Sequence, residues 1–312
     1  MNISICITTL NEEGTIVPLL DSLLNQSKKP EQIIFVDGGS TDKTVEIIRH
    51  YQQKDSKIKL LVEKCPRARG RNFACEIAKG EIIAMTDAGC IADRDWLKNI
   101  TKPFDTGKVD VSAGFYKMTG NSTLQKAESA FLGVRPGKFN YHFLPSTRSI
   151  AFTKKIWEEV GGFPEDSDGT AEDTVFNYKL VKAKAKISRV KDAIVEWGMP
   201  ENLPAFFWKI FAYAKGDARS KIWIFPGKGI MSHNIKALSV LFRYLFGLLL
   251  LILSFKYNAL PFLVILIFVY LIWAFRKIYL EFGDYRIALW GPILQLTSDV
   301  AVIGGFISGI LG

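Results

Sequence analysis

Short apolar runs alternate with helical patterns along the first ninety residues. Four runs rich in Ile and Val have the length of buried strands and cover residues 3–10, 32–36, 57–62 and 82–86. Three stretches between them repeat apolar side chains at helical spacing, at residues 16–25, 43–53 and 71–79. Strand and helix in alternation predict right-handed crossovers and a mostly parallel sheet of an α/β domain.

Polar clusters follow three of these strands, at residues 8–12, 37–40 and 87–89. Neighbouring parallel strands bring such clusters to one edge of the sheet, where open α/β sheets bind ligands. Asp87 stands at this edge, and a carboxylate there suits a hard cation that neutralises a diphosphate. The alternative for one isolated Asp is a side chain that forms a hydrogen bond to the backbone of its own turn. The shared position of all three clusters favours a binding site.

Four ordered motifs resemble family-2 glycosyltransferases of the GT-A fold. They cover residues 8–13, 34–42, 69–74 with 86–88, and 161–165 with 171–174. The resemblance spans about residues 3 to 220 and implies a nucleotide-diphosphate sugar, UDP- or GDP-linked, as donor. The donor-binding residues that it implies are Thr8, Asn11, Glu12, Asp37, Gly39, Arg71, Asp87 and Ala88. Of these, Asp37 would contact the base and Arg71 the diphosphate or sugar, although Arg71 alone would also fit a solvated helix start.

The resemblance also implies a Mg²⁺ or Mn²⁺ ion at Asp87. The family's usual motif is Asp-x-Asp, and Gly89 stands here at the third place. One carboxylate can still hold such a cation together with phosphate oxygens and water. Asp93 and His233 are weaker alternatives for a further ligand, because a lone His is more often a surface residue.

Asp173, in the pair Glu172-Asp173, matches the family's general base, which accepts the acceptor's proton during an inverting displacement. The pair also suits a helix start, where the dipole favours carboxylates, and both roles are compatible. Residues 114–148 are the expected acceptor region, with Arg135, Lys138 and Arg148 able to meet phosphate. A mobile solvated loop is the alternative for this region.

The last third of the chain predicts membrane helices. Residues 238–255, 259–275 and 287–311 are long and apolar, and each can reach across about 30 Å of hydrocarbon. Residues 203–224 mix aromatic and basic side chains, which suits a membrane interface, or equally a helix that caps the soluble core. We therefore expect a catalytic domain at 1–200, an interface segment at 201–234 and about three membrane helices at 235–312.

Loop charges predict that the catalytic domain faces the cytoplasm and that the spans run out, in and out again, with the C-terminus outside. The four cysteines show no Cys-x-x-Cys spacing, consistent with a reducing compartment. The net charge of +9 comes with no nucleic-acid recognition module.

Three functions remain open from the sequence. The first is a membrane-anchored inverting glycosyltransferase acting on polyprenyl-phosphate or a lipid-linked saccharide. The second is a polysaccharide-extending glycosyltransferase, and the third is a catalytically silent nucleotide-binding scaffold, favoured only by Gly89. Membrane lipids are expected partners of any of these, and the sequence does not determine an oligomeric state.

Overall fold

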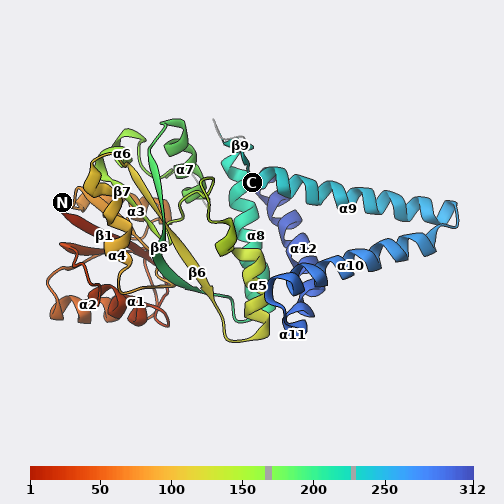
Figure 1. Ribbon diagram of the computed structural model, residues 1–312, viewed down its shortest axis with the longest axis horizontal. Helices are drawn as coiled ribbons and strands as arrows, with labels where there is room; N and C mark the ends of the chain where they lie inside the picture. Colours follow the sequence, from red (N-terminus) through yellow and green to blue (C-terminus); the bar gives the residue numbers. More distant parts are fainter. Residues whose placement is uncertain (166–170, 226–229) are drawn as a thin grey trace.

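A computed structural model describes residues 1–165, 171–225 and 230–312. An α/β domain that holds the N-terminus lies on one side of the molecule, and long helices lie on the other (Figure 1). Helix α8 (Leu203–Ser220) stands between the two parts. Part of the predicted interface segment, residues 226–229, lies outside the described residues.

The sheet of the α/β domain has the strand order β3-β2-β1-β4-β7-β6-β8-β5 among the described residues. Its strands are β1 (Ile3–Thr9), β2 (Gln32–Asp37), β3 (Ile58–Val62), β4 (Ile82–Met85), β5 (Cys90–Ala92), β6 (Val111–Thr119), β7 (Ile150–Thr153) and β8 (Ile187–Gly198). Only β5 and β7 run against the other six. The predicted mostly parallel α/β sheet is therefore confirmed.

Helices cover both faces of this sheet because the buried strands alternate their side chains between two cores. Ile5 and Ile7 of β1 join the core beneath one layer of helices, whereas Cys6 joins the core on the opposite face. The helices of the domain are α1 (Ile16–Leu24), α2 (Thr44–Lys54), α3 (Arg67–Ile77), α4 (Trp96–Thr101), α5 (Thr123–Leu132), α6 (Lys154–Glu159) and α7 (Glu172–Lys182).

Helix α3 begins at Arg67, four residues before the predicted start. Gly70 interrupts the apolar pattern, yet it belongs to the helix and lies against β1, where an added Cβ would come within 3.2 Å of Thr8 Cγ2. The earlier start places Arg71 in the second turn, where it is buried. The alternative reading of Arg71 as a solvated helix start is therefore wrong.

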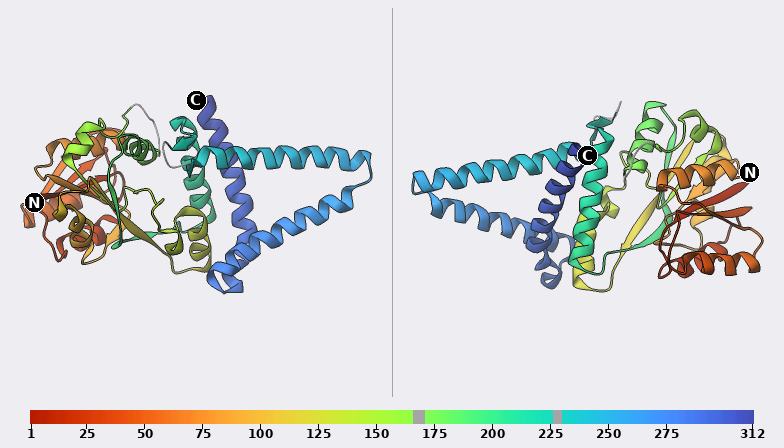
Figure 2. Two further views of the ribbon diagram at one scale, coloured as in Figure 1. Left: turned by 45° about the horizontal axis from the view of Figure 1, so that its top comes forward. Right: turned by 180° about the vertical axis from the view of Figure 1, so that it is seen from behind.

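The C-terminal part contains α9 (His233–Lys256), α10 (Leu260–Phe282), the short α11 (Tyr285–Ala288) and α12 (Trp290–Leu311). Among the described residues, three helices are long and apolar enough to cross a membrane. Helices α9 and α10 project away from the rest of the molecule as a hairpin, whereas α12 stays beside α8 (Figures 1 and 2).

Candidate active site

The turns after β1 and β2 are bonded to each other at the carboxyl edge of the sheet. Asn11 Oδ1 accepts the Thr41 amide at 2.9 Å, and Ser40 Oγ accepts the Asn11 amide at 2.8 Å. Strand β4, which leads to Asp87, pairs with β1 on its other side. The three polar clusters therefore share one edge, as the alternation of strands and helices predicted.

Asp37 builds the turn that follows β2. Its Oδ1 accepts the amides of Gly39 and Ser40 at 3.0 and 2.8 Å, and its Oδ2 accepts the Thr9 hydroxyl at 2.9 Å. Gly39 has φ +98°, a conformation that side chains rarely adopt. The carboxylate is completely buried, so its bonds fix the shape of the turn next to the crevice.

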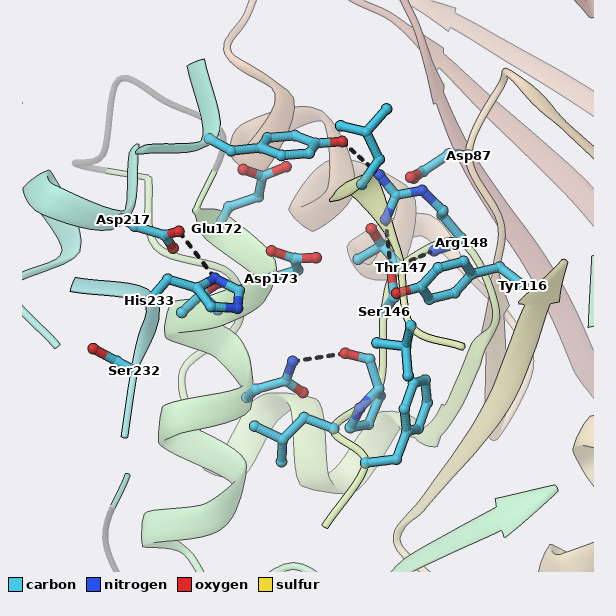
Figure 3. A pocket seen from close by; sticks show the side chains of 18 of the residues that line it. Asp87, Tyr116, Ser146, Thr147, Arg148, Glu172, Asp173, Asp217, Ser232 and His233 are labelled. Atoms are coloured by element: carbon cyan, nitrogen blue, oxygen red, sulfur yellow. Dashed lines mark hydrogen bonds and ion pairs between the residues drawn. The ribbon is translucent and has the colours of Figure 1, made fainter. Parts of the chain in front are cut away.

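A cavity of about 710 Å³ opens beside Asp87, between the sheet edge, α7 and α8 (Figure 3). The predicted site residues that line it are Arg71, Asp87, Lys138, Arg148, Glu172 and Asp173. The other predicted residues do not line it, and these are Thr8, Asn11, Glu12, Asp37, Gly39, Ala88 and Arg135. Most of the latter lie on the turns at the sheet edge, next to this cavity in the fold.

Arg71 joins three elements at the floor of the cavity. One guanidinium nitrogen donates to Glu172 Oε1 at 2.6 Å, and the other donates to Asp87 Oδ1 and Thr147 Oγ1, each at 2.9 Å. Arg71 is 4% exposed and Glu172 is 2% exposed, so this ion pair is shielded from water. A planar guanidinium suits such a three-way contact, which holds α3, α7 and the end of β4 in place.

The arginines also set the charge state of Asp87. Burial by itself would raise the pKa of Asp87, but the guanidinium groups of Arg71, Arg148 and Arg67 hold it below its usual value. Asp87 therefore stays ionised at neutral pH. Its side chain keeps about a third of its surface exposed to the cavity.

Asp173 lies at the middle of the cavity, between Arg148 and His233 (Figure 3). It follows Glu172 in the first turn of α7, where the helix dipole favours a carboxylate. Burial, and secondly the charge of Glu172, raise the pKa of Asp173 to about 6. A carboxylate with a pKa near neutrality that faces a cavity has the properties of a general base.

Arg148 is fixed on the opposite wall by aromatic side chains. Its guanidinium lies 3.8 Å from the ring of Trp197 and donates to the Tyr213 hydroxyl at 2.8 Å. It also donates to Ser146 Oγ at 3.1 Å. Cation–π contact and hydrogen bonds hold the positive charge in a defined position at the cavity, where an anion can meet it.

Two predicted positions lie away from the cavity. Arg135 forms an ion pair with Glu281 of α10 and thereby ties the loop after α5 to a C-terminal helix. Asp93 lies near Glu196 and Lys117, outside the cavity lining, so the structure does not bring it to Asp87. The other weaker candidate for a metal ligand, His233, does line the cavity, with Nδ1 3.0 Å from Asp217 Oδ2.

The sequence did not mark several residues of the far wall as site residues. These are Tyr116, Tyr213, Asp217, Ser232 and Lys236. They come from β6, from α8 and from the N-terminal end of α9, and more than eighty residues separate β6 from the two helices along the chain. The mixture of aromatic and basic residues at 203–224 is the available sequence signal for Tyr213 and Asp217, and it indicated a membrane interface or a helix that caps the soluble core.

The fold and the site define a GT-A glycosyltransferase. The family model of glycosyl transferase family 2 matches residues 4–163, about half of the chain. The chain therefore belongs to glycosyltransferase family 2. The sequence resemblance drawn from the four motifs is thereby confirmed.

Relatives and solved structures agree with this assignment. A dolichyl N-acetyl-α-D-glucosaminyl phosphate 3-β-D-2,3-diacetamido-2,3-dideoxy-β-D-glucuronosyltransferase of Methanococcus voltae is 26% identical over 72% of this chain and 77% of its own length. The O-antigen chain rhamnosyltransferase RfbN of Salmonella typhimurium is 27% identical over 62% of this chain and 66% of its own length.

Among solved structures, the mannosyltransferase PcManGT of Pyrobaculum calidifontis, in complex with GDP-Man and Mn²⁺, has a TM-score of 0.56 at 21% identity. The match covers 70% of this chain and 62% of that protein. Staphylococcus aureus TarS residues 1–349 in complex with UDP-GlcNAc have a TM-score of 0.54 at 22% identity, over 71% and 68% of the two chains. At these identities the likeness establishes the GT-A fold.

Proposed function

We propose that this protein is an inverting glycosyltransferase that moves a sugar from a UDP- or GDP-sugar to a membrane-associated acceptor. The observation that carries the proposal is Asp173, a carboxylate whose pKa is raised to about 6 and which faces the cavity beside Asp87. The buried pair of Arg71 and Glu172 supports it, because this pair holds the segment of Asp173 against the end of β4.

In the proposed reaction Asp173 accepts the proton of the acceptor hydroxyl while that oxygen attacks the anomeric carbon. The new carbon–oxygen bond forms as the bond to the nucleotide diphosphate breaks on the opposite face, so the configuration inverts. Arg148 and Arg67, which both line the cavity, can neutralise the charge that builds on the leaving diphosphate. For an acceptor that is already ionised, Asp173 would orient the nucleophile instead.

The residues fit a divalent cation that takes one protein ligand. Asp87 offers the cavity an ionised carboxylate, although Arg71 already donates to its Oδ1. Nothing lies within 4 Å of the place where a Cβ of Gly89 would stand, so the neighbouring space is open. Among the described residues no cluster of three His, Cys, Asp or Glu side chains could hold the ion alone. A bound Mg²⁺ or Mn²⁺ would stabilise negative charge on the diphosphate, with the remaining ligands from the donor and water.

Polyprenyl-phosphate or a lipid-linked saccharide is the acceptor class that we propose. The basic residues Lys138, His233 and Lys236 line the cavity, and the last two belong to the start of the long apolar helix α9. An acceptor that reaches the cavity from a bilayer would therefore pass basic groups that attract phosphate. The Methanococcus relative, whose name includes a dolichyl phosphate substrate, is consistent with this class.

Chain extension of a polysaccharide is the second function to test, because TarS and RfbN are named for polymer substrates. We further propose that α9 and α10 anchor the protein in a membrane with the catalytic domain on the cytoplasmic face. Lys236, Arg276 and Arg286 near the ends of these helices fit the preference of cytoplasmic loops for positive charge.

The test is sugar transfer by protein purified in detergent, with UDP- and GDP-sugars, Mg²⁺ or Mn²⁺, and polyprenyl-phosphate or a polymer acceptor. We expect one donor to yield a glycolipid with inverted configuration, and Asp173→Asn to abolish transfer to a hydroxyl. Asp192→Asn, on an exposed residue of β8 outside the cavity, is the matched control and should keep full activity. Donor binding without turnover on every acceptor would favour the silent scaffold instead.

A further inference from the structure

Helix α12 runs beside α8 and in the same direction (Figures 1 and 2). A Cβ at Gly305 would stand 2.3 Å from the carbonyl oxygen of Phe211, and one at Gly309 would stand 2.4 Å from that of Lys215. The two helices therefore touch backbone to backbone, which only small residues allow. From the first of these contacts to the second, the chain advances by about one turn on each helix. Helices α12 and α8 are therefore parallel and side by side over this length, and would lie at equal depth in a membrane.

The opposite face of α8 forms a wall of the catalytic cavity. Tyr213 accepts a hydrogen bond from Arg148 at 2.8 Å, Asp217 pairs with His233, and Lys209 lies 4.6 Å from the Trp197 ring. Helix α8 is therefore held between the catalytic domain on one side and α12 on the other. Because α8 lines this polar site, it has to stay outside the hydrocarbon of a membrane.

The hairpin of α9 and α10 has a different environment. Its outer parts contact little besides each other, and Phe262 is 71% and Phe268 63% exposed. The helices have 24 and 23 residues, about 35 Å each, which suffices to cross the hydrocarbon of a bilayer. Lys256 and Tyr257 mark the tip, where a polar end can reach the far surface.

Helix α12 passes across the base of this hairpin. Asp299, at its middle, accepts hydrogen bonds from Tyr244 of α9 at 3.0 Å and Tyr270 of α10 at 2.5 Å, and pairs with Arg243 at 2.7 Å. The views of the ribbon show α12 crossing the direction of the hairpin instead of following it (Figures 1 and 2). If α12 spanned the bilayer, α8 would enter with it and carry Lys209 and Asp217 toward the hydrocarbon, at a high cost.

The outer face of α12 carries an apolar stripe at helical spacing. Its exposed members are Ile293, Leu296, Val300, Ile307 and Leu311, and exposed Leu289 continues the stripe at the N-cap. Exposed Trp208 and Trp223 lie on and just after α8, and indole rings favour the membrane interface. A helix with one packed face and one continuous apolar face suits a position in the plane of a lipid surface.

We propose that α12 lies along the membrane surface and does not cross it. The chain then crosses the bilayer twice, through α9 and α10, and its C-terminus lies on the same side as the catalytic domain. This arrangement differs from the outside C-terminus that the loop charges predicted. It rests on the proposed membrane anchor and is independent of the donor, the acceptor and the chemistry.

Depth measurement separates the two arrangements. We would place one spin label at a time at Ile293, Val300 or Ile307 by substitution with Cys, in the whole chain with Cys65→Ser, reconstituted into vesicles of phosphatidylcholine with anionic lipid. Oxygen and nickel-chelate accessibility should then report equal, shallow depths along α12. The same labels at Phe262, Val269 and Leu280 of α10 provide the control and should differ in depth. A deep Val300 between shallower ends of α12 would overturn the proposal.

Sidedness provides the second measurement. An impermeant maleimide is applied to oriented membrane vesicles of protein with Cys65→Ser and a single added thiol. We expect a thiol placed after Gly312 to react from the same side as Lys59→Cys in the catalytic domain, and Tyr257→Cys at the hairpin tip to react from the other side. Either thiol on the wrong side would overturn the two-crossing topology. Release of the protein from membranes by alkaline carbonate would instead refute the anchor itself.

Discussion

The ionisation of Asp173 gives the sharpest test of the site. Burial and the charge of Glu172 raise its pKa from 3.8 to about 6, and Arg71 and Arg148 limit the rise. A base works only when ionised, so activity should be present above the raised pKa and be lost as the pH falls through it. Replacing Glu172 by Gln removes its negative charge, which is the second cause of the raised pKa. The pKa of Asp173 should then fall, and activity should be lost at a lower pH.

The expected size follows from the pKa. With a pKa of about 6, Asp173 is roughly nine-tenths ionised at pH 7 and one-tenth at pH 5, so kcat/KM should fall about tenfold. A carboxylate with the ordinary value of 3.8 would remain more than about nine-tenths ionised over the same interval. The two cases are therefore easily distinguished.

Hydrolysis of the donor sugar by water, without an acceptor, is a suitable assay. Water needs a base, and a sugar–diphosphate diester has no ionisation of its own near pH 6. His233 lines the same cavity and is a second titratable group there, hydrogen-bonded to Asp217, so His233→Gln is the control and should keep the acid limb. A flat profile from pH 7 to 5, or an acid limb that persists in Asp173→Asn, would refute the assignment of Asp173 as base.

Three further substitutions test other parts of the molecule. Arg71→Ala leaves Glu172 without its main buried partner, so thermal unfolding should show a loss of about 3–5 kcal/mol, and an unchanged Tm would contradict the buried pair. Gly305→Val drives a side chain into α8 and should cost about 1–3 kcal/mol, whereas Gly247→Val on open α9 should be neutral. Asp299→Asn removes the charge that pairs with Arg243, and protease should then cut the hairpin base faster, an effect whose absence would argue against the pairing.

Much of the α/β domain could be predicted from the sequence because its signals are local. Strands such as β2 contain short apolar runs, and the turns that follow them carry polar residues at fixed offsets. The right-handed crossover then orders the strands, so the shared edge of the clusters at 8–12, 37–40 and 87–89 follows without coordinates. The motifs around Asp87 and Asp173 likewise identify the site's carboxylates.

Only the tertiary structure shows which residues bond to these carboxylates. Arg71 is bonded to Glu172, which lies 101 positions later, and Arg148 stacks on Trp197. No periodicity encodes such pairings, because they depend on how β7, α7 and α8 pack around one cavity. For the same reason Arg135, an equally basic residue of the predicted acceptor region, pairs with Glu281 instead of lining the cavity.

In the C-terminal third, too, the sequence determines some features and only the tertiary structure decides others. Length and apolar composition determined that three helices suit a lipid environment, since each signal lies within one helix. Composition does not distinguish a helix that crosses a bilayer from one whose apolar surface is divided between a protein partner and lipid. For α12 that distinction depends on its contact with α8 through Gly305 and Gly309, which only the packing of the folded chain decides.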